Sequence, residues 1–224
     1  MTRARVAWLA VALLVASSAA LGGHDDTAAS PAVSLFLGRT NVPLITYRAR
    51  RHLEAANRRF KKQAWLDCVT SLDERGFSYE VTSSGGSPYV LHKVLLAALD
   101  AERDLIHERP AAGFVETNYE MTDDGADGDW LRIKLHPRRR DRLLLDGWLL
   151  VSPADGALVE AKGRLAKAPS FWTTRVEVVR RHRQIAGVTV PVLIESVASV
   201  RIAGPSTFSM RYDYDAINGI ALGE

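Results

Sequence analysis

The sequence predicts a mainly β (α+β) protein: a curved antiparallel sheet or incomplete β-barrel, with one long helix covering the open face. Three observations predict this fold. Long stretches toward the C-terminus alternate between apolar and polar residues, glycine-containing turns separate them, and one amphipathic helical pattern stands among them without a repeated βαβ unit. We therefore expect eight or more strands around a single long helix.

The longest strands are predicted between residues 171 and 218. In the last of them Phe208 and Tyr212 lie at alternating apolar positions, so the strand has one apolar face. The dipeptides Ala186-Gly187 and Gly204-Pro205 separate the three strands. Short glycine-containing turns between alternating runs are typical of antiparallel hairpins.

Shorter alternating runs come earlier in the chain and predict further strands. They cover residues 47–55, 64–71, 77–82, 131–136, 143–151 and 157–165. In the first run Arg51 interrupts an otherwise apolar face, and the composition there would also tolerate a helix. The alternation favours a strand.

One helix is predicted between Ser87-Pro88 and Pro110. Ser87 can cap the free amides, and Pro88 occupies a position where a missing N–H costs nothing. Apolar residues from Val90 to Leu105 recur at helical spacing, so the helix has one apolar face. We expect residues 89–106 to cover the sheet.

The N-terminus has the order of a secretory signal peptide. Arg3 and Arg5 precede an apolar run over 6–16, and small residues follow to Ala20. We expect a signal peptide over 1–20, a flexible lead over 21–43 and a single domain over 44–224. An uncleaved anchor is the alternative, but the apolar run is short for a span of about 20 residues. No cysteine follows the run, so the exported protein is not expected to be a lipoprotein.

Charge and motifs exclude several classes of function. Without Arg3 and Arg5 the chain keeps 27 basic and 26 acidic side chains, which is not the excess typical of nucleic-acid binding. No G-x-S-x-G motif is present, Cys68 is the single cysteine, and the six histidines lack zinc-site spacings. We expect no enzyme activity, no cofactor and no metal; the acidic stretch over 123–129 resembles a calcium loop but lacks its ligand pattern.

The candidate site residues fall into an apolar set and a basic set. If the sheet closes, the apolar set is core; if it stays half open, the set lines a cavity for an apolar ligand. The cavity candidates are Tyr47, Leu53, Trp65, Phe77, Tyr79, Leu91, Leu95, Trp148, Trp172, Phe208 and Tyr212. Candidates for contact with a lipid headgroup or a protein partner are Arg138, Arg139, Arg140, Arg181 and Arg183.

Four segments resemble bacterial outer-membrane lipoprotein-sorting proteins of the LolA-like superfamily. They are Gly147-Trp148 with Asp155-Gly156, the stretch over 163–172, Val190-Pro191-Val192, and the Y-x-Y strand over 206–214. The resemblance covers residues 47–219. It implies a periplasmic half-barrel, with helices as a lid, that holds the acyl chains of a lipoprotein or lipid. We thus expect a non-catalytic carrier; the alternative is an envelope sensor or scaffold of the same fold, with a filled interior, that docks a protein partner.

Overall fold

The computed structural model describes residues 30–104, 113–171 and 173–223. Its strands are β1 (Tyr47–Asn57), β2 (Lys62–Asp73), β3 (Gly76–Gly86), β4 (Tyr119–Asp127), β5 (Trp130–Pro137), β6 (Leu145–Val151), β7 (Leu158–Leu165), β8 (Thr173–Ile185), β9 (Val188–Val200), β10 (Gly204–Ile217) and β11 (Ile220–Ala221). The expected signal peptide over 1–20 and the first part of the expected lead lie outside the described residues.

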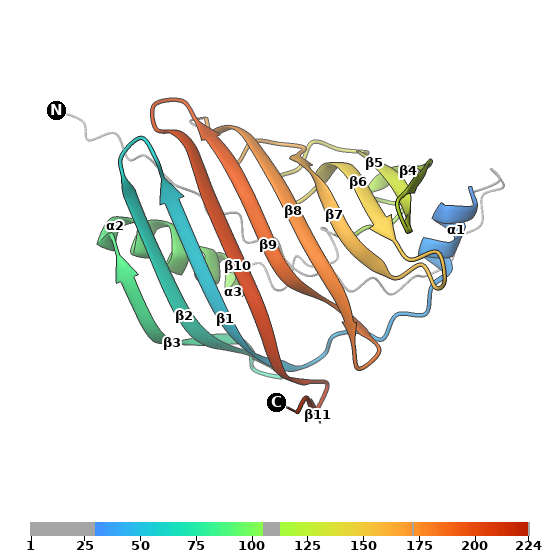
Figure 1. Ribbon diagram of the computed structural model, residues 1–224, viewed down its shortest axis with the longest axis horizontal. Helices are drawn as coiled ribbons and strands as arrows, with labels where there is room; N and C mark the ends of the chain where they lie inside the picture. The colour runs from blue at the N-terminus through green and yellow to red at the C-terminus, as the bar shows by residue number, and fades with distance from the viewer. Residues whose placement is uncertain (1–29, 105–112, 172, 224) are drawn as a thin grey trace.

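The strands form one 11-stranded antiparallel sheet in the order β3-β2-β1-β10-β9-β8-β7-β6-β5-β4, with β11 beside β10. Neighbours in the sheet are neighbours in the chain except at one place, where β10 pairs with β1 along its length. The sheet ends at β3 and β4 without closing (Figure 1). The predicted fold class, a curved open antiparallel sheet with a helix, is confirmed.

The predicted hairpin between β8 and β9 has its turn at Ala186-Gly187. Both residues have positive φ, 50° and 77°, and the two strands pair from Ile185 opposite Val188 onward. Two successive residues of positive φ are characteristic of the type I′ turn, whose twist matches that of the flanking strands. The same geometry recurs at Asn218-Gly219, which joins β10 to β11.

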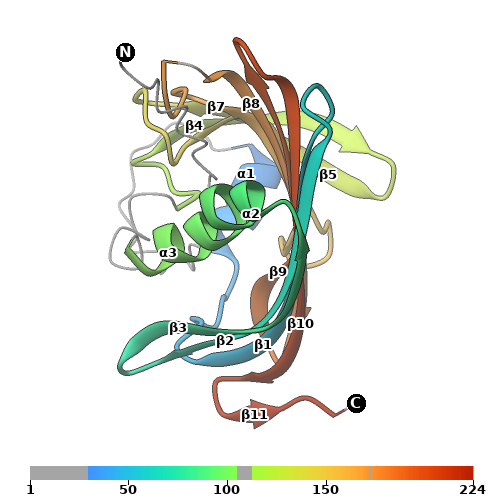
Figure 2. The same ribbon diagram turned by 90° about the vertical axis from the view of Figure 1, so that its left-hand side faces the viewer.

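The helix over residues 88–104 lies on the concave face of the sheet. It runs without interruption through α2 (Pro88–Val90), the π-helical segment η1 (Leu91–Leu96) and α3 (Ala97–Asp104), and it begins where the sequence predicts. Figure 2 shows it inside the curve formed by β1, β2 and β3. The part of the prediction beyond residue 104 lies outside the described residues. Among the described residues no helix has the length and apolarity needed to cross a membrane.

The lead expected over 21–43 contains a helix that the sequence did not predict. This helix is α1 (Pro31–Gly38), and it begins at a proline in its first turn. Ala32, Val33 and Phe36 are buried and pack beside β4 and β5. Burial of these side chains, rather than periodicity over a long stretch, holds the segment in place.

Two apolar clusters line the concave side of the sheet. The first joins β1, β2, β3, β9 and β10 to the helix over residues 88–104, and the second joins α1 to β4, β5, β6, β7 and β8. The clusters meet where β8 pairs with β9. That boundary is the centre of the sheet, so each cluster covers about one half of the concave face.

Candidate functional site

Most of the predicted cavity residues lie in the first cluster. The buried ones are Tyr47, Leu53, Phe77, Leu95, Phe208 and Tyr212, and Tyr79 and Leu91 are partly buried against them. They come from β1, β3, β10 and the helix. The structure therefore brings these eight residues together on the concave face, directly beneath or within the helix.

Two predicted cavity residues lie on the opposite, outer face. Trp65 is opposite Glu54, is 39% exposed and stacks on His52 with ring centroids 6.3 Å apart. The ring centre of Trp148 lies 5.6 Å from Nζ of Lys162. Alternation groups the residues of a strand into two faces without saying which is inward, and both tryptophans share a face with charged residues. They are not candidates for an interior site; Trp172 lies outside the described residues.

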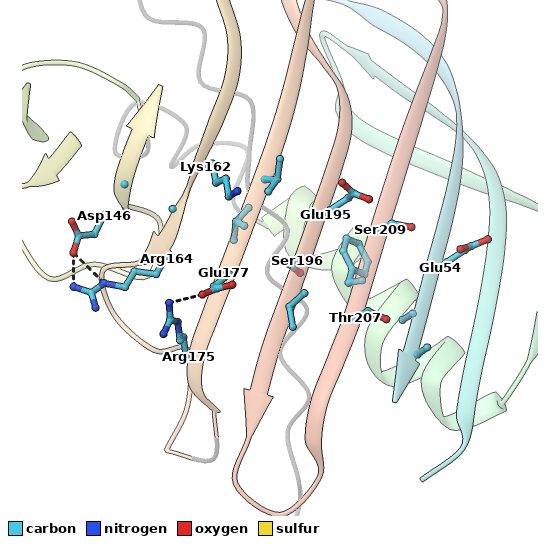
Figure 3. Close-up of a pocket in the computed structure, with 18 of the residues that line it drawn as sticks. Glu54, Asp146, Lys162, Arg164, Arg175, Glu177, Glu195, Ser196, Thr207 and Ser209 are labelled. Atoms are coloured by element: carbon cyan, nitrogen blue, oxygen red, sulfur yellow. Dashed lines mark hydrogen bonds and ion pairs between the residues drawn. The ribbon is translucent and has the colours of Figure 1, made fainter. Parts of the chain in front are cut away.

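The outer face has a shallow hollow of about 760 Å³ where Trp148 lies. Figure 3 shows charged residues around it, including Asp146, Arg164, Arg175 and Glu177. Arg164 Nη2 lies 2.8 Å from Asp146 Oδ2, and Arg175 pairs with Glu177. The hollow thus combines paired charges with apolar side chains such as Trp148 and Val179, and it lies on the outer face rather than beneath the helix, where the sequence predicted a cavity.

A buried ion pair connects the concave face to the helix. Arg51, in the middle of β1, places Nη1 2.6 Å from Oε2 of Glu102, which belongs to α3. The Nη2 atom donates to Glu102 Oε1 at 3.1 Å and to the Tyr47 hydroxyl at 2.5 Å. The side chains of Arg51 and Glu102 are only 1% and 6% exposed. The residue that interrupts the apolar pattern of β1 is thus held by a carboxylate 51 residues away in the chain.

Aromatic rings surround the Arg51 guanidinium. Its central carbon lies 4.3 Å from the ring centre of Tyr212, 5.3 Å from Phe77 and 5.7 Å from Tyr47. Burial opposes the charge, but Glu102 and the hydroxyls of Tyr212 and Tyr47 raise the pKa of Arg51 above its ordinary value. Burial also raises the pKa of Tyr212. The site therefore holds a permanent cation and neutral phenols.

A second buried cation lies at the boundary between the two clusters. Arg180, on β8, is 4% exposed, and burial lowers its pKa to about 10. Two residues further on, burial and the neighbouring charges of Arg180 and Arg39 lower the pKa of His182 to about 3. Neither residue is among the site candidates predicted from the sequence, although Arg180 falls on the apolar face of its strand, two residues after Val178.

Three of the five predicted basic residues donate hydrogen bonds to neighbouring groups of the protein. Arg138 Nε donates to the carbonyl oxygens of Glu116 and Tyr119, at 2.8 and 3.2 Å. Arg139 Nη1 donates to Asn118 Oδ1 at 2.6 Å, and Arg181 Nε to Glu160 Oε2 at 3.0 Å. Arg140 and Arg183 are exposed. Arg138, Arg139 and Arg140 follow β5, whereas Arg181 and Arg183 lie near the end of β8.

The described residues contain no group of three or more His, Cys, Asp or Glu side chains placed to hold a metal ion. The acidic stretch that resembles a calcium loop is the hairpin of β4 and β5. There Arg132 Nε lies 2.7 Å from Asp124 Oδ2, and its Nη1 lies 3.5 Å from Asp127 Oδ2. An arginine thus occupies the position beside these carboxylates that a cation would take.

No protein-family model matches the chain, and no curated protein matches it. Among solved structures, a DUF1329 family protein from Desulfovibrio piger is 10% identical, with 80% of this chain and 88% of that one covered and a TM-score of 0.34. An outer membrane lipoprotein-sorting protein domain from Vibrio parahaemolyticus is 8% identical, with 82% and 89% covered and a TM-score of 0.40. The second is of the class that the sequence motifs resemble. Both likenesses are distant and concern the fold, so neither carries an argument about what this chain binds.

Proposed function

We propose that this protein is a non-catalytic carrier of the bacterial periplasm that holds an acyl chain of a lipid or lipoprotein against the concave face of its sheet. In this proposal the helix over residues 88–104 is a displaceable cover. The observation that supports it most directly is the ion pair between Arg51 and Glu102. Because of this pair, the contact between the helix and the sheet is polar at its centre.

The energetics of an acyl chain set the requirement for such a carrier. A chain that leaves a membrane loses about 0.8 kcal/mol for every CH₂ group exposed to water, so a carrier must offer a continuous apolar surface. The concave face provides two apolar clusters that extend across the sheet. A chain could replace the helix against the first cluster without leaving that surface exposed to water.

The ion pair lowers the cost of moving the helix. A buried ion pair contributes little net stability, because the attraction between the charges roughly offsets the loss of their hydration. While the helix is apart from the sheet and before a chain takes its place, both charges regain water, whereas an all-apolar contact would lose its full burial energy. The π-helical turn over Leu91–Leu96 adds a local departure from α-helical geometry, of the kind often found at functional sites.

The competing function is that of an envelope sensor or scaffold whose interior stays filled. The packing beneath the helix favours this second function, since Leu53 of the sheet and Leu95 and Leu99 of the helix are fully buried in the same cluster. In that case the helix never leaves, and the exposed Arg140 and Arg183 are among the groups that would meet a protein partner. The two functions differ in whether the protein holds lipid.

The test is native mass spectrometry of the mature protein purified from its host envelope, followed by lipid extraction. A carrier is expected to retain lipid or acylated peptide and to take up a fluorescent fatty acid. Leu95→Glu, which places a charge in the apolar contact, should abolish uptake while β-sheet circular dichroism persists. The matched control is Lys93→Glu, at an exposed position of the same helix. Ligand-free protein without uptake would favour the scaffold.

A further inference from the structure

Arg180 occupies the centre of the concave face. The strand register places it between Ala161 of β7 and Ile194 of β9. The same row continues through Leu149 and Ile133 on one side, and through Met210, Leu53 and Leu66 on the other. Every other member of this row is apolar and buried. Arg180 is therefore a single charge in an apolar row that extends across eight strands.

This guanidinium lacks the counter-charge that Arg51 has. Its Nε atom is buried and has no hydrogen-bond partner among the described residues. Arg180 also takes part in none of the ion pairs that those residues form. The groups that interact with it electrostatically include the phenols of Tyr119 and Tyr212 and the imidazole of His182. These carry no charge at neutral pH.

The other titratable groups near Arg180 add positive charge or none. His182 lies two residues further along β8, and its Nδ1 atom is buried without a partner. Arg39, which follows α1, interacts electrostatically with His182 and places its guanidinium 3.7 Å from the ring centre of Phe36. Its Nε atom is also buried and unpartnered. Two arginines and an imidazole thus share this region, and none has a described carboxylate beside it.

A buried cation without a partner is costly, and such groups in native proteins call for a physical explanation. Removing Arg180 from the apolar row would stabilise the empty protein. An anion that occupied this position would gain a charge-assisted pair in a medium from which water is largely excluded. The planar guanidinium suits a carboxylate or a phosphate, both of which it can bind through two parallel hydrogen bonds.

We propose that Arg180 binds the anionic group, a carboxylate or a phosphate, of the molecule that the concave face carries. The inference rests on the proposed carrier function and specifies its ligand as an anionic amphiphile. Because Arg180 lies where the two clusters meet, the apolar chain can extend over either cluster while its charged end stays at the centre. The phenols of Tyr119 and Tyr212 interact electrostatically with Arg180, and a phenolic hydroxyl can donate a hydrogen bond to an anion.

The test compares binding of dansyl-undecanoic acid with binding of its uncharged methyl ester. Wild-type protein is expected to bind the acid about tenfold or more tightly than the ester, in line with a charge-assisted hydrogen-bonded pair. Arg180→Met should lose this preference while still binding the ester, and Arg180→Lys should keep part of it. The matched control is Arg183→Met, an exposed arginine of the same strand, which should behave as wild type.

Thermal unfolding of the ligand-free proteins supplies a second readout. Arg180→Met is expected to unfold at a higher temperature than wild type, since it removes an unpaired buried charge. Higher stability together with lost acid preference would distinguish a binding group from a merely structural one. An Arg180→Met protein that keeps the wild-type preference, or unfolds at a lower temperature, would overturn the inference.

The outcomes separate this inference from the carrier function. If wild type binds acid and ester equally well, the carrier function stands and the role of Arg180 is wrong. If wild type binds neither probe, the carrier function fails and the inference fails with it. Competition against bound dansyl-undecanoic acid then identifies the source of the anion. Displacement by oleate indicates a carboxylate, and displacement by lysophosphatidic acid indicates a phosphate. Zwitterionic lysophosphatidylcholine should displace the probe less well than either.

Discussion

Arg51 Nη1 lies 2.6 Å from Glu102 Oε2 in the interior of the protein, and this contact joins the centre of β1 to α3. Around it, the helix and the sheet meet through apolar side chains such as Leu95 and Leu99. The contact between helix and sheet therefore combines apolar burial with one enclosed pair of opposite charges, and the two parts respond differently to substitution.

Glu102→Leu is expected to lower the free energy of unfolding by about 3–5 kcal/mol, because it leaves the Arg51 guanidinium buried without its partner. The double variant Arg51→Met with Glu102→Leu should recover most of this loss or exceed wild-type stability, since no charge remains buried. Urea unfolding measures both effects. A double variant as unstable as the single one would show that the pair itself, rather than the unpaired charge, supplies the stability.

The same double variant tests the helix as a cover. With an all-apolar contact the helix should separate less readily from the sheet, so uptake of a fluorescent fatty acid is expected to slow while the protein remains folded. Arg50→Met with Asp213→Leu is the matched control, because that pair is exposed on the outer face, with the two side chains 59% and 70% exposed. Equal uptake rates in the two double variants would argue against a moving helix.

Lowering the pH from about 6.5 to 4 should destabilise the protein through His182. Burial, with the nearby charges of Arg180 and Arg39, lowers the folded-state pKa of His182 from 6.5 to about 3. In this window the unfolded chain takes up a proton that the folded protein does not, so stability falls by up to about 1.4 kcal/mol per pH unit. Above pH 6.5 both states are neutral at His182 and its contribution is complete.

The measurement is urea unfolding at several pH values in wild type and in His182→Gln, which should flatten the slope. His136→Gln is the control, since His136 is exposed. His52 does not affect the result: the hydrogen bonds that its ring donates to Glu54 and Asp67 raise its pKa, so the stability it contributes is fully present below pH 6.5. An unchanged slope in His182→Gln would show that the imidazole is not held neutral.

Gly147→Ala is expected to destabilise the protein by about 1–3 kcal/mol. Gly147 of β6 pairs with Gly163 of β7, and a Cβ atom on Gly147 would lie 2.1 Å from the Lys162 carbonyl oxygen. Backbone atoms cannot give way as a flexible side chain would. Gly38→Ala is the control, because nothing lies within 4 Å of the position its Cβ would take. Chemical unfolding that shows equal stability for both variants would mean that β6 and β7 can move apart without cost.

The sequence predicts the sheet well where strands are long and alternate regularly. The strands β8, β9 and β10, the Ala186-Gly187 turn and the start of the helix at Pro88 are all present as expected. Three elements were not predicted: α1, β4 and the two-residue strand β11. The segment α1 is too short to show periodicity, and four of the nine residues of β4 are acidic, so its hydrophobic pattern is weak. Pairing with β5, rather than its own residues, makes β4 a strand.

The candidate site is predictable only in part, because its polar groups depend on contacts distant in the sequence. Arg51 is visible as an anomaly in the alternation of β1, yet nothing local identifies Glu102 as its partner. Arg180 gives a similar signal in β8. The faces of Trp65 and Trp148 depend on which side of each strand meets the helix or α1, and this choice is made by the whole sheet rather than by either strand.

The free edges of the open sheet bear on how the molecule avoids self-association. Strand β4 presents Asp123, Asp124 and Asp127 at one edge, so two copies aligned edge to edge would bring carboxylates into opposition. Strand β3 is mostly polar and ends at Gly85-Gly86, and its pairing with β2 is interrupted by a bulge beside Cys68. Neither edge is a good template for a further strand. The protein can thus leave its sheet unclosed without inviting the fibrous assembly to which long, flat apolar edges are prone.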